Sequence, residues 1–342
     1  MRKTRKNEHI ENCLKAEYIG ETLFEDIYLE HNPLPELALE EIDTRTEFLG
    51  KPVSFPLIIN SMTGGSEMAE GINRELASLA AKYDLPMAVG SQQIIFEDED
   101  SLSSFTVVRE VMGEEGIIIG NLGASCTMEE FEHAVDLIAA DAMQIHLNPA
   151  QELVMEDGDR DFRGWLANIQ RLAEASKRPM ILKEVGYGIP KSTGDILYDA
   201  GVRIIDIAGF GGTNFTEIEN LRAADADYSD LYCWGNPTAK LLLDYRQKEK
   251  DLQVIASGGV KTGLDIVKAF VLGADMIGIS GEILNYLIHG GIDNADRYLQ
   301  HLIYKTRAVM LLVGARNLEE LADVRFAVTG KLRQLTDPFE NV

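Results

Sequence analysis

Short apolar runs alternate along this chain with longer segments in which apolar positions recur at the spacing of an amphipathic helix. Short apolar strands that alternate with helices are typical of βαβ units and of a parallel sheet. Each run is rich in Ile, Val, Leu or Met, and polar or glycine-rich residues follow it. The eight runs are PLIIN ending at Asn60, PMAVG at Gly90, GIIIG at Gly120, AMQIH at His146, MILKE at Glu184, RIIDIA at Ala208, QVIAS at Ser257 and DMIGIS at Ser280.

Eight strand–helix units predict an α/β fold of the TIM (β/α)8 barrel type, which typically occupies about 250 residues. We expect one domain, with an N-terminal arm over about residues 1–50, the barrel over about 51–290 and a C-terminal helical extension over about 291–342. A doubly wound sheet is the main alternative. All eight segments that follow the runs meet on one face of a barrel, whereas only those near the switch point meet in a doubly wound sheet.

Charge narrows the choice of partner. The chain has 342 residues, 56 of them acidic and 32 basic, for a formal net charge of -24. Such a surface repels nucleic acids and anionic membranes, so neither is an expected partner, and an anionic ligand needs a local basic site.

No stretch reaches the roughly 18 apolar residues of a membrane span. The three cysteines, Cys13, Cys126 and Cys233, form no CxxC pair, which argues against disulfides and favours a cytoplasmic protein.

Glycine-rich segments after the sixth, seventh and eighth runs indicate a phosphate site. Gly258 and Gly259 follow the seventh run; Ser280 ends the eighth, and Gly281 follows it at the start of a predicted helix. In barrels these two loops and a helix N-terminus commonly bind phosphate through backbone N–H groups. Thr213, in the segment GFGGTNF after the sixth run, extends the same wall. The alternative interpretation is that these glycines only form tight turns.

Polar residues after earlier runs surround the same predicted face. Met62 and Thr63 follow the first run, and Ser91 and Asn121 follow the second and third. Ser, Thr and Asn at such places also serve as helix caps, so either role is open. Lys183 lies inside an apolar run, where its ammonium group is costly to bury unless it meets an anion or an electron-rich partner.

The segment QIHLNPAQE contributes His146, Asn148, Gln151 and Glu152. Asn148, Pro149 and Gln151 resemble a capping box, but that interpretation has no use for His146 or Glu152. A single carboxylate near amide oxygens suits Mg2+, which binds through one or two carboxylates and substrate phosphates. Zinc is not indicated, because no HExxH motif or cysteine set accompanies the histidine.

The chain opens with MRKTRKNEHI, a basic cluster in an acidic protein. A solvated terminus explains such a cluster, and so does a clamp for an anionic ligand. Together with it, a set of further motifs closely resembles type 2 isopentenyl-diphosphate isomerases from residue 5 to about residue 281. These motifs are TRKNEHI, SMTGG, GSQ, GNLGA, QIHLNPAQE, KEVGYGI, GGTNF, WGNPTA and ASGGVKTGLDI.

The resemblance implies a TIM barrel that binds FMN and Mg2+ and interconverts isopentenyl and dimethylallyl diphosphate in isoprenoid biosynthesis, with NADPH as the reductant of the flavin. It implies catalytic roles for Gln151 and His146 and a Mg2+ ligand in Glu152. The substrate diphosphate would be held by Arg5, Lys6, His9, His146 and Asn148. The FMN contacts implied are Met62, Thr63, Ser91, Asn121, Lys183, Thr213, Gly258, Gly259, Ser280 and Gly281.

One position departs from the family pattern. Many members carry Arg as the third residue of an SQR motif, whereas this chain has Gln93, so a substrate contact there would lose its charge. Two other functions stay open. An FMN-dependent α-hydroxy-acid oxidoreductase needs an HxGxR motif that this sequence lacks, and a non-catalytic flavin or prenyl-phosphate binding protein has no use for a metal carboxylate. The arm and the C-terminal helices favour a homo-oligomer, a tetramer or an octamer.

Overall fold

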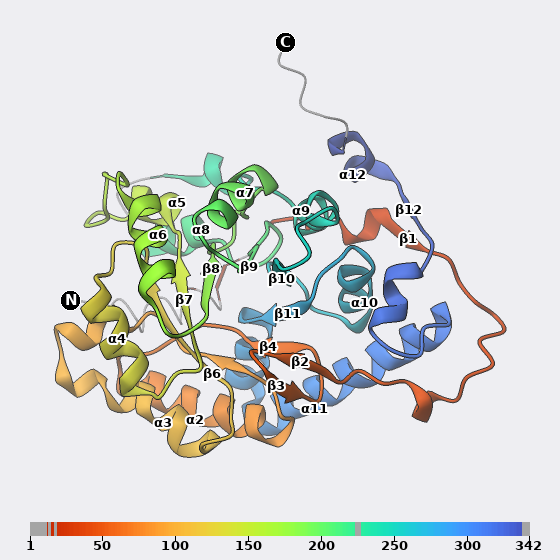
Figure 1. Ribbon diagram of the computed structural model, residues 1–342, viewed down its shortest axis with the longest axis horizontal. Coiled ribbons are helices and arrows are strands. Elements are labelled where there is room, and N and C mark those ends of the chain that lie inside the picture. The colour runs from red at the N-terminus through yellow and green to blue at the C-terminus, as the bar shows by residue number, and fades with distance from the viewer. Residues whose placement is uncertain (1–11, 13–14, 17–18, 223–226, 337–342) are drawn as a thin grey trace, which may run out of the picture.

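The computed structural model describes residue 12 and residues 15–16, 19–222 and 227–336. Eight parallel strands close into a barrel in which each strand pairs with its neighbour in the chain and the last pairs with the first (Figure 1). Each predicted apolar run forms one strand, so the barrel prediction is confirmed and a doubly wound sheet is excluded. The strands are β4 (Leu57–Ile59), β5 (Met87–Ala88), β6 (Ile118–Gly123), β7 (Ala142–His146), β8 (Met180–Lys183), β9 (Ile204–Asp206), β10 (Gln253–Ala256) and β11 (Met276–Ile279).

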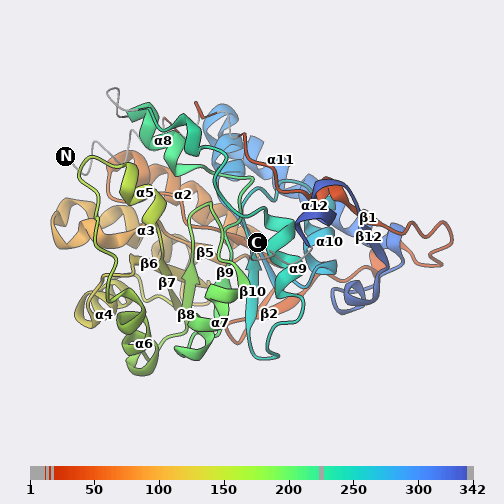
Figure 2. The ribbon, with the colours of Figure 1, turned by 90° about the horizontal axis from the view of Figure 1, so that it is seen from above.

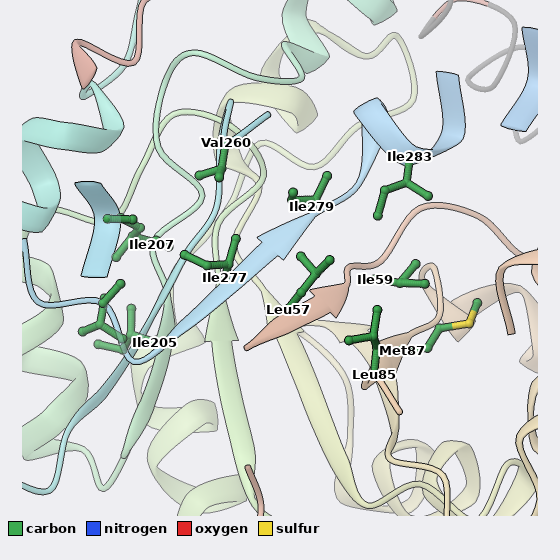
Figure 3. Packing of buried hydrophobic residues seen from close by; sticks show 14 of the residues in the cluster. Leu57, Ile59, Leu85, Met87, Ile205, Ile207, Val260, Ile277, Ile279 and Ile283 are labelled. Atoms are coloured by element: carbon green, nitrogen blue, oxygen red, sulfur yellow. The ribbon is translucent and has the colours of Figure 1, made fainter. Parts of the chain in front are cut away.

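The strands bury both of their faces, which explains why they read as continuous apolar runs rather than alternating ones. In β4, Leu57 and Ile59 pack outward among the residues shown in Figure 3, whereas Ile58 belongs to a separate cluster inside the barrel. Phe48 and Val53 join that inner cluster from a hairpin of two strands, β2 (Thr46–Phe48) and β3 (Lys51–Val53). The hairpin therefore closes the N-terminal end of the barrel and leaves the C-terminal end for a site.

Helices form the outer layer around the strands (Figures 1 and 2). In α2, Ser66 caps the first turn by accepting a hydrogen bond from the Ala69 N–H, and Ile72 and Leu76 are buried against the barrel. The helices are α2 (Glu67–Lys82), α3 (Ser103–Met112), α4 (Met128–Leu137), α5 (Pro149–Val154), α6 (Trp165–Ala175), α7 (Lys191–Asp199), α8 (Phe215–Arg222), α9 (Thr238–Tyr245), α10 (Gly263–Val271), α11 (Gly281–Val313) and α12 (Gly330–Leu335). Short 3-10 helices cover Phe24–Asp26, Leu39–Glu41, Gln92–Phe96, Glu99–Ser101, Ser229–Leu231 and Glu319–Asp323.

The C-terminal extension is more than the helices expected from the sequence. The last barrel helix, α11, runs on to Val313 across a kink at Gly291, whose φ is 69°. Beyond it, β12 (Phe326–Val328) pairs antiparallel with β1 (Ile27–Leu29) of the N-terminal arm, as Figure 1 shows. This pairing fixes the two ends of the described chain to each other. In the described ranges, every helix is too short or too polar to traverse a lipid bilayer.

Candidate active site

A cavity of about 640 Å³ opens at the C-terminal end of the barrel, where the loops after all eight strands contribute to its wall. This is the face on which TIM-barrel enzymes build their active sites. Every predicted site residue in the described part of the chain lines it. These residues are Met62, Thr63, Ser91, Gln93, Asn121, His146, Asn148, Gln151, Glu152, Lys183, Thr213, Gly258, Gly259, Ser280 and Gly281. Arg5, Lys6 and His9 lie outside the described residues.

The glycine-rich loops after β9 and β10 contact each other through their backbones. Gly258 and Gly259 have φ angles of 93° and 83°, a region that favours glycine. A Cβ on Gly258 would lie 1.9 Å from the carbonyl oxygen of Gly209, and one on Gly212 would lie 2.5 Å from the nitrogen of Gly259. The adjacent helix α11 begins at Gly281, and no side chain caps its first turn. Such a cradle beside a helix N-terminus fits a phosphate group.

Two polar groups in the wall fit the other end of a flavin mononucleotide. The Thr63 hydroxyl is buried and has no hydrogen-bond partner among the described residues, so a bound polar ring would satisfy it. The Lys183 ammonium is also buried, where it donates to the Glu184 carbonyl oxygen at 2.9 Å and lies 3.7 Å from the Asp206 carboxylate. A lysine with a remaining donor suits an electron-rich ring. With the glycine cradle, these groups fit FMN.

A chain of buried side chains crosses the barrel interior from Asp206 to His146. Asn60 donates its Nδ2 to Asp206 Oδ2 at 2.7 Å, and Gln144 Nε2 donates to Asn60 Oδ1 at 2.8 Å. Asn121 Nδ2 donates to Gln144 Oε1 at 3.1 Å, and Asn121 Oδ1 lies 2.9 Å from His146 Nδ1. These polar residues at the strand ends thus form one connected hydrogen-bond network under the cavity.

The network fixes the tautomer of His146. Asp206 is fully buried, and its carboxylate accepts hydrogen bonds from Asn60 and Ser257. Each amide along the chain must then present its nitrogen toward Asp206 and its oxygen toward His146, which leaves Asn121 Oδ1 to accept from His146 Nδ1–H. Nε2 is therefore the nitrogen at which this imidazole gains or loses a proton. The protonated ring is a second donor suited to a phosphate oxygen.

Helix α5 brings the other predicted polar residues into the cavity. Pro149 occupies its first position, as predicted, but the capping interpretation of Asn148 is wrong because its side chain makes no cap hydrogen bond. The Asn148 amide donates instead to Gln151 Oε1 at 3.3 Å and to Glu152 Oε1 at 2.8 Å. The side chains of Asn148, Gln151 and Glu152 are thus held as one cluster.

Glu219 is a functional candidate that the sequence did not indicate. Gln151 Nε2 donates to Glu219 Oε1 at 3.1 Å, and the other Glu219 oxygen accepts from Arg222 Nε at 2.9 Å. The Glu219 carboxylate is 1% exposed, so it places a negative charge behind the Gln151 amide in a low-dielectric setting. Its position in α8, outside any motif, gave no local signal. Only the packing of α8 against α5 reveals it.

Glu152 is held at both of its carboxylate oxygens. Oε1 accepts from Asn148, and Oε2 accepts from the backbone N–H of Asp159 at 2.9 Å. Within the described residues, no group of three or more His, Cys, Asp or Glu side chains is placed to bind a metal ion alone. One oriented carboxylate fits Mg2+, which retains water and takes further oxygens from substrate phosphates. It does not fit a site enclosed by protein.

Two other carboxylates, Glu130 and Glu184, hold parts of the cavity wall in place. Gln93 Nε2 donates to Glu130 Oε1 at 3.2 Å, so this residue presents a neutral amide to the cavity.

The buried Glu184 carboxylate accepts three backbone N–H groups, from Gly186, Tyr187 and Gly188, at 2.6 to 3.0 Å. Burial raises the pKa of Glu184 despite these donors. Glu184 therefore acts as a buried anchor for the loop after β8, a role that the sequence did not reveal.

Known proteins are similar to this chain over most of its length. Residues 124–327, more than half of the chain, match the family of FMN-dependent dehydrogenases. An isopentenyl-diphosphate delta-isomerase of Listeria innocua is 40% identical over 334 residues, which cover 97% of this chain and 93% of the relative. The chain belongs to the isopentenyl-diphosphate delta-isomerase family. An isomerase of Bacillus pumilus is also 40% identical, over 96% of this chain and 92% of its own length.

Solved structures resemble this isomerase-family chain in fold at much lower identity. A lactate oxidase of Pediococcus acidilactici has a TM-score of 0.70 at 16% identity and covers 96% of this chain and 93% of its own. A flavocytochrome b2 has a TM-score of 0.71 at 16% identity, over 98% of this chain and 86% of its own. The barrel is therefore shared with oxidases, while the family assignment rests on the isomerases. Both the family and the fold predicted from the sequence are confirmed.

Proposed function

We propose that this protein interconverts isopentenyl diphosphate and dimethylallyl diphosphate, with FMN and Mg2+ bound in the barrel cavity. The observation that carries the proposal is the α5 cluster of Asn148, Gln151 and Glu152, which shares one cavity with the glycine cradle. The cradle accounts for a phosphorylated cofactor, and the cluster supplies a metal carboxylate and an oriented amide beside it. Membership of the isopentenyl-diphosphate delta-isomerase family supports the substrate class.

The diphosphate end of the substrate needs cations and hydrogen-bond donors. His146, with Nδ1–H held by Asn121, would donate Nε2–H to a phosphate oxygen when its ring is protonated, and Glu152 would hold Mg2+, which would supply positive charge for the diphosphate. We assign the remaining charge to Arg5, Lys6 and His9 of the N-terminal arm. Arg forms bidentate contacts with phosphate oxygens, and Lys adds a point charge.

Moving the double bond requires a proton added at the terminal alkene carbon and a proton removed from the internal methylene on the other side of the tertiary carbon, which carries positive charge between the two events. Reduced FMN, when bound, supplies an electron-rich ring that stabilises such charge. The Gln151 amide is fixed by Asn148 and by Glu219, so its orientation is set before the substrate binds. The buried Glu219 carboxylate, which is itself paired with Arg222, holds the nitrogen end of that amide from outside the cavity wall.

Several further parts of the proposal have indirect support. The reaction has no net redox change, but the flavin must be reduced first, and we assign NADPH as its reductant.

Exposed Tyr304 and Leu312 on α11 offer apolar contact for a homo-oligomer, a tetramer or an octamer. Cys126 and Cys233 are both free thiols, in keeping with a cytoplasmic location.

An anaerobic assay tests the function against the oxidases that share the fold. The FMN-loaded protein is reduced, mixed with Mg2+ and isopentenyl diphosphate, and examined for dimethylallyl diphosphate. In a parallel arm, the oxidised enzyme is mixed with lactate or mandelate and its flavin absorbance is followed. We expect isomer in the first arm and no flavin bleaching in the second. Bleaching by a hydroxy acid, without isomer in the first arm, would favour an oxidoreductase.

A further inference from the structure

The loop after α5 folds back onto the start of that helix, next to Glu152. Asp159 reaches Glu152 through its backbone, because its N–H donates to Glu152 Oε2 at 2.9 Å. Asp159 also lines the cavity. The loop therefore supplies one of the two hydrogen bonds that orient the carboxylate, and Asn148 supplies the other. Anything that holds this loop in place also holds Glu152.

Arg160 holds the loop by collecting backbone carbonyl groups. Its Nη1 donates to the carbonyl oxygens of Glu152 at 2.5 Å, Gly158 at 2.7 Å and Asp159 at 3.1 Å, and its Nη2 donates to that of Met155 at 2.6 Å. Carbonyl groups at a helix C-terminus lack partners within the helix, and a cation there is favourable. One guanidinium thus connects the end of α5 to the loop that returns to Glu152.

Gly158 makes this arrangement possible. A Cβ at this position would lie 2.0 Å from the Glu152 carbonyl oxygen and 3.0 Å from Arg160 Nη1. No side chain fits there unless the loop moves away from α5. The contact at Gly158 is independent of charge, so it is a second, separate observation that the loop and Glu152 form one unit.

We propose that Arg160 and Gly158 are positioning residues for the metal site, which set the affinity of Glu152 for a divalent cation without touching substrate or metal. The proposal rests on the proposed role of Glu152 as the Mg2+ ligand. With both oxygens held by a donor, the carboxylate meets the cation in one orientation, and releasing the loop removes one of the two holds. Groups that orient a metal ligand typically change metal affinity about 10–100-fold when they are replaced.

The chain offers a matched control in Arg163. It lies in the same segment, but its side chain is 90% exposed and its hydrogen bonds go to the Asp161 carboxylate alone among the described residues. Arg163→Gln removes the same charge at nearly the same place as Arg160→Gln, without releasing a carbonyl of α5. The two variants therefore separate positioning of the loop from local electrostatics.

The test measures Mn2+ binding by the EPR signal of the free ion, on full-length FMN-loaded enzyme with oxidised flavin and isopentenyl diphosphate present. We expect Arg160→Gln and Gly158→Ala each to raise the Kd for Mn2+ about tenfold, and Arg163→Gln to leave it unchanged. In the reduced enzyme, saturating Mg2+ should restore kcat of both loop variants, which a misfolded protein would not show. FMN content and circular dichroism confirm that each variant folds.

Glu152→Gln distinguishes a failure of the positioning role from a failure of the metal assignment. If Glu152→Gln weakens Mn2+ binding while both loop variants bind as the wild type does, the positioning role is overturned and the metal assignment stands. Equal weakening by Arg160→Gln and Arg163→Gln would also overturn it, because charge alone would then explain the effect. Unchanged binding in Glu152→Gln would overturn the metal assignment and this inference with it, while the isomerase assay would still test the reaction separately.

Discussion

Gln151 and Glu219 are hydrogen bonded at 3.1 Å across the packing of α5 against α8, and both side chains are buried. Since a carboxylate only accepts, this bond fixes which end of the Gln151 amide is its nitrogen. Asn148 binds the oxygen end at 3.3 Å. Gln151, on one short helix, is therefore oriented by the carboxylate of Glu219, which lies 68 positions further along the chain.

Replacing Glu219 by glutamine should impair the reaction without removing the cofactor. The new amide also donates, so Gln151 can rotate and lose its single orientation. We expect kcat to fall about 10²-fold, the typical effect of a misplaced group near reacting atoms. FMN content should stay as in the wild type. The control is Glu156→Gln, an exposed carboxylate in the loop after α5. Wild-type kcat in Glu219→Gln would remove Glu219 from the site.

Replacing Asp206 by asparagine should allow the imidazole of His146 to adopt both neutral tautomers. The amide chain through Asn60, Gln144 and Asn121 is oriented by an acceptor that cannot donate, and asparagine can do both. Imidazole ¹⁵N shifts of labelled protein, assigned with His146→Asn, should give one Nδ1–H tautomer in the wild type and a mixture in Asp206→Asn. A wild-type spectrum from the variant would show that the network does not orient the histidine.

Gly258→Ala should cost FMN binding. Both Gly258 and Gly164 have positive φ, 93° and 86°, so alanine costs about 1–2 kcal/mol of backbone strain at either place. Only at Gly258 does the new Cβ also meet backbone, the Gly209 carbonyl oxygen at 1.9 Å, whereas nothing lies within 4 Å at Gly164. Equilibrium dialysis should find FMN affinity reduced in Gly258→Ala and unchanged in Gly164→Ala. Equal affinities would argue against the cradle as the phosphate site.

Cys126 should resist alkylation in the native protein. Burial, and next the charge of Glu130, raise the pKa of its thiol from 9.0 to about 12. In the unfolded chain the Cys126 thiol has its ordinary pKa of 9.0. The native state therefore holds this proton more tightly than the unfolded state does, and its free energy of unfolding falls as pH rises from about 9 toward 12. Iodoacetamide at pH 8 with peptide mass mapping should modify the exposed Cys233 and leave Cys126 intact. Comparable modification of both would contradict the buried placement.

The barrel could be predicted because its strands are local and continuous. Each apolar run carried enough signal alone, and the polar residues that follow the runs had to meet once the sheet closed. Thr63, Lys183 and Gly258 reached the cavity wall in this way. The pairing of Ile27 with Val328 could not be predicted, because two strands of three residues each, some three hundred positions apart, have no local pattern that distinguishes them from loops.

The missed parts of the site depend on contacts between distant or irregular segments. Glu219 reaches Gln151 only through the packing of two short helices. The Glu184 carboxylate accepts hydrogen bonds from backbone N–H groups, which no side-chain motif encodes. Asn148 has the sequence of a cap, but hydrogen bonds to Gln151 and Glu152 take its amide instead. Propensity describes the isolated segment, and here tertiary contacts override it.

Proton exchange is the most direct measure of the proposed isomerisation. Reduced, FMN-loaded enzyme with Mg2+ is incubated anaerobically with isopentenyl diphosphate in D2O, and the products are followed by ¹H NMR. The predicted result is dimethylallyl diphosphate that carries solvent deuterium at the carbon that gains the new hydrogen, formed over many turnovers with no further consumption of reductant. The contradicting result is unchanged isopentenyl diphosphate in the presence of bound, reduced FMN and saturating Mg2+.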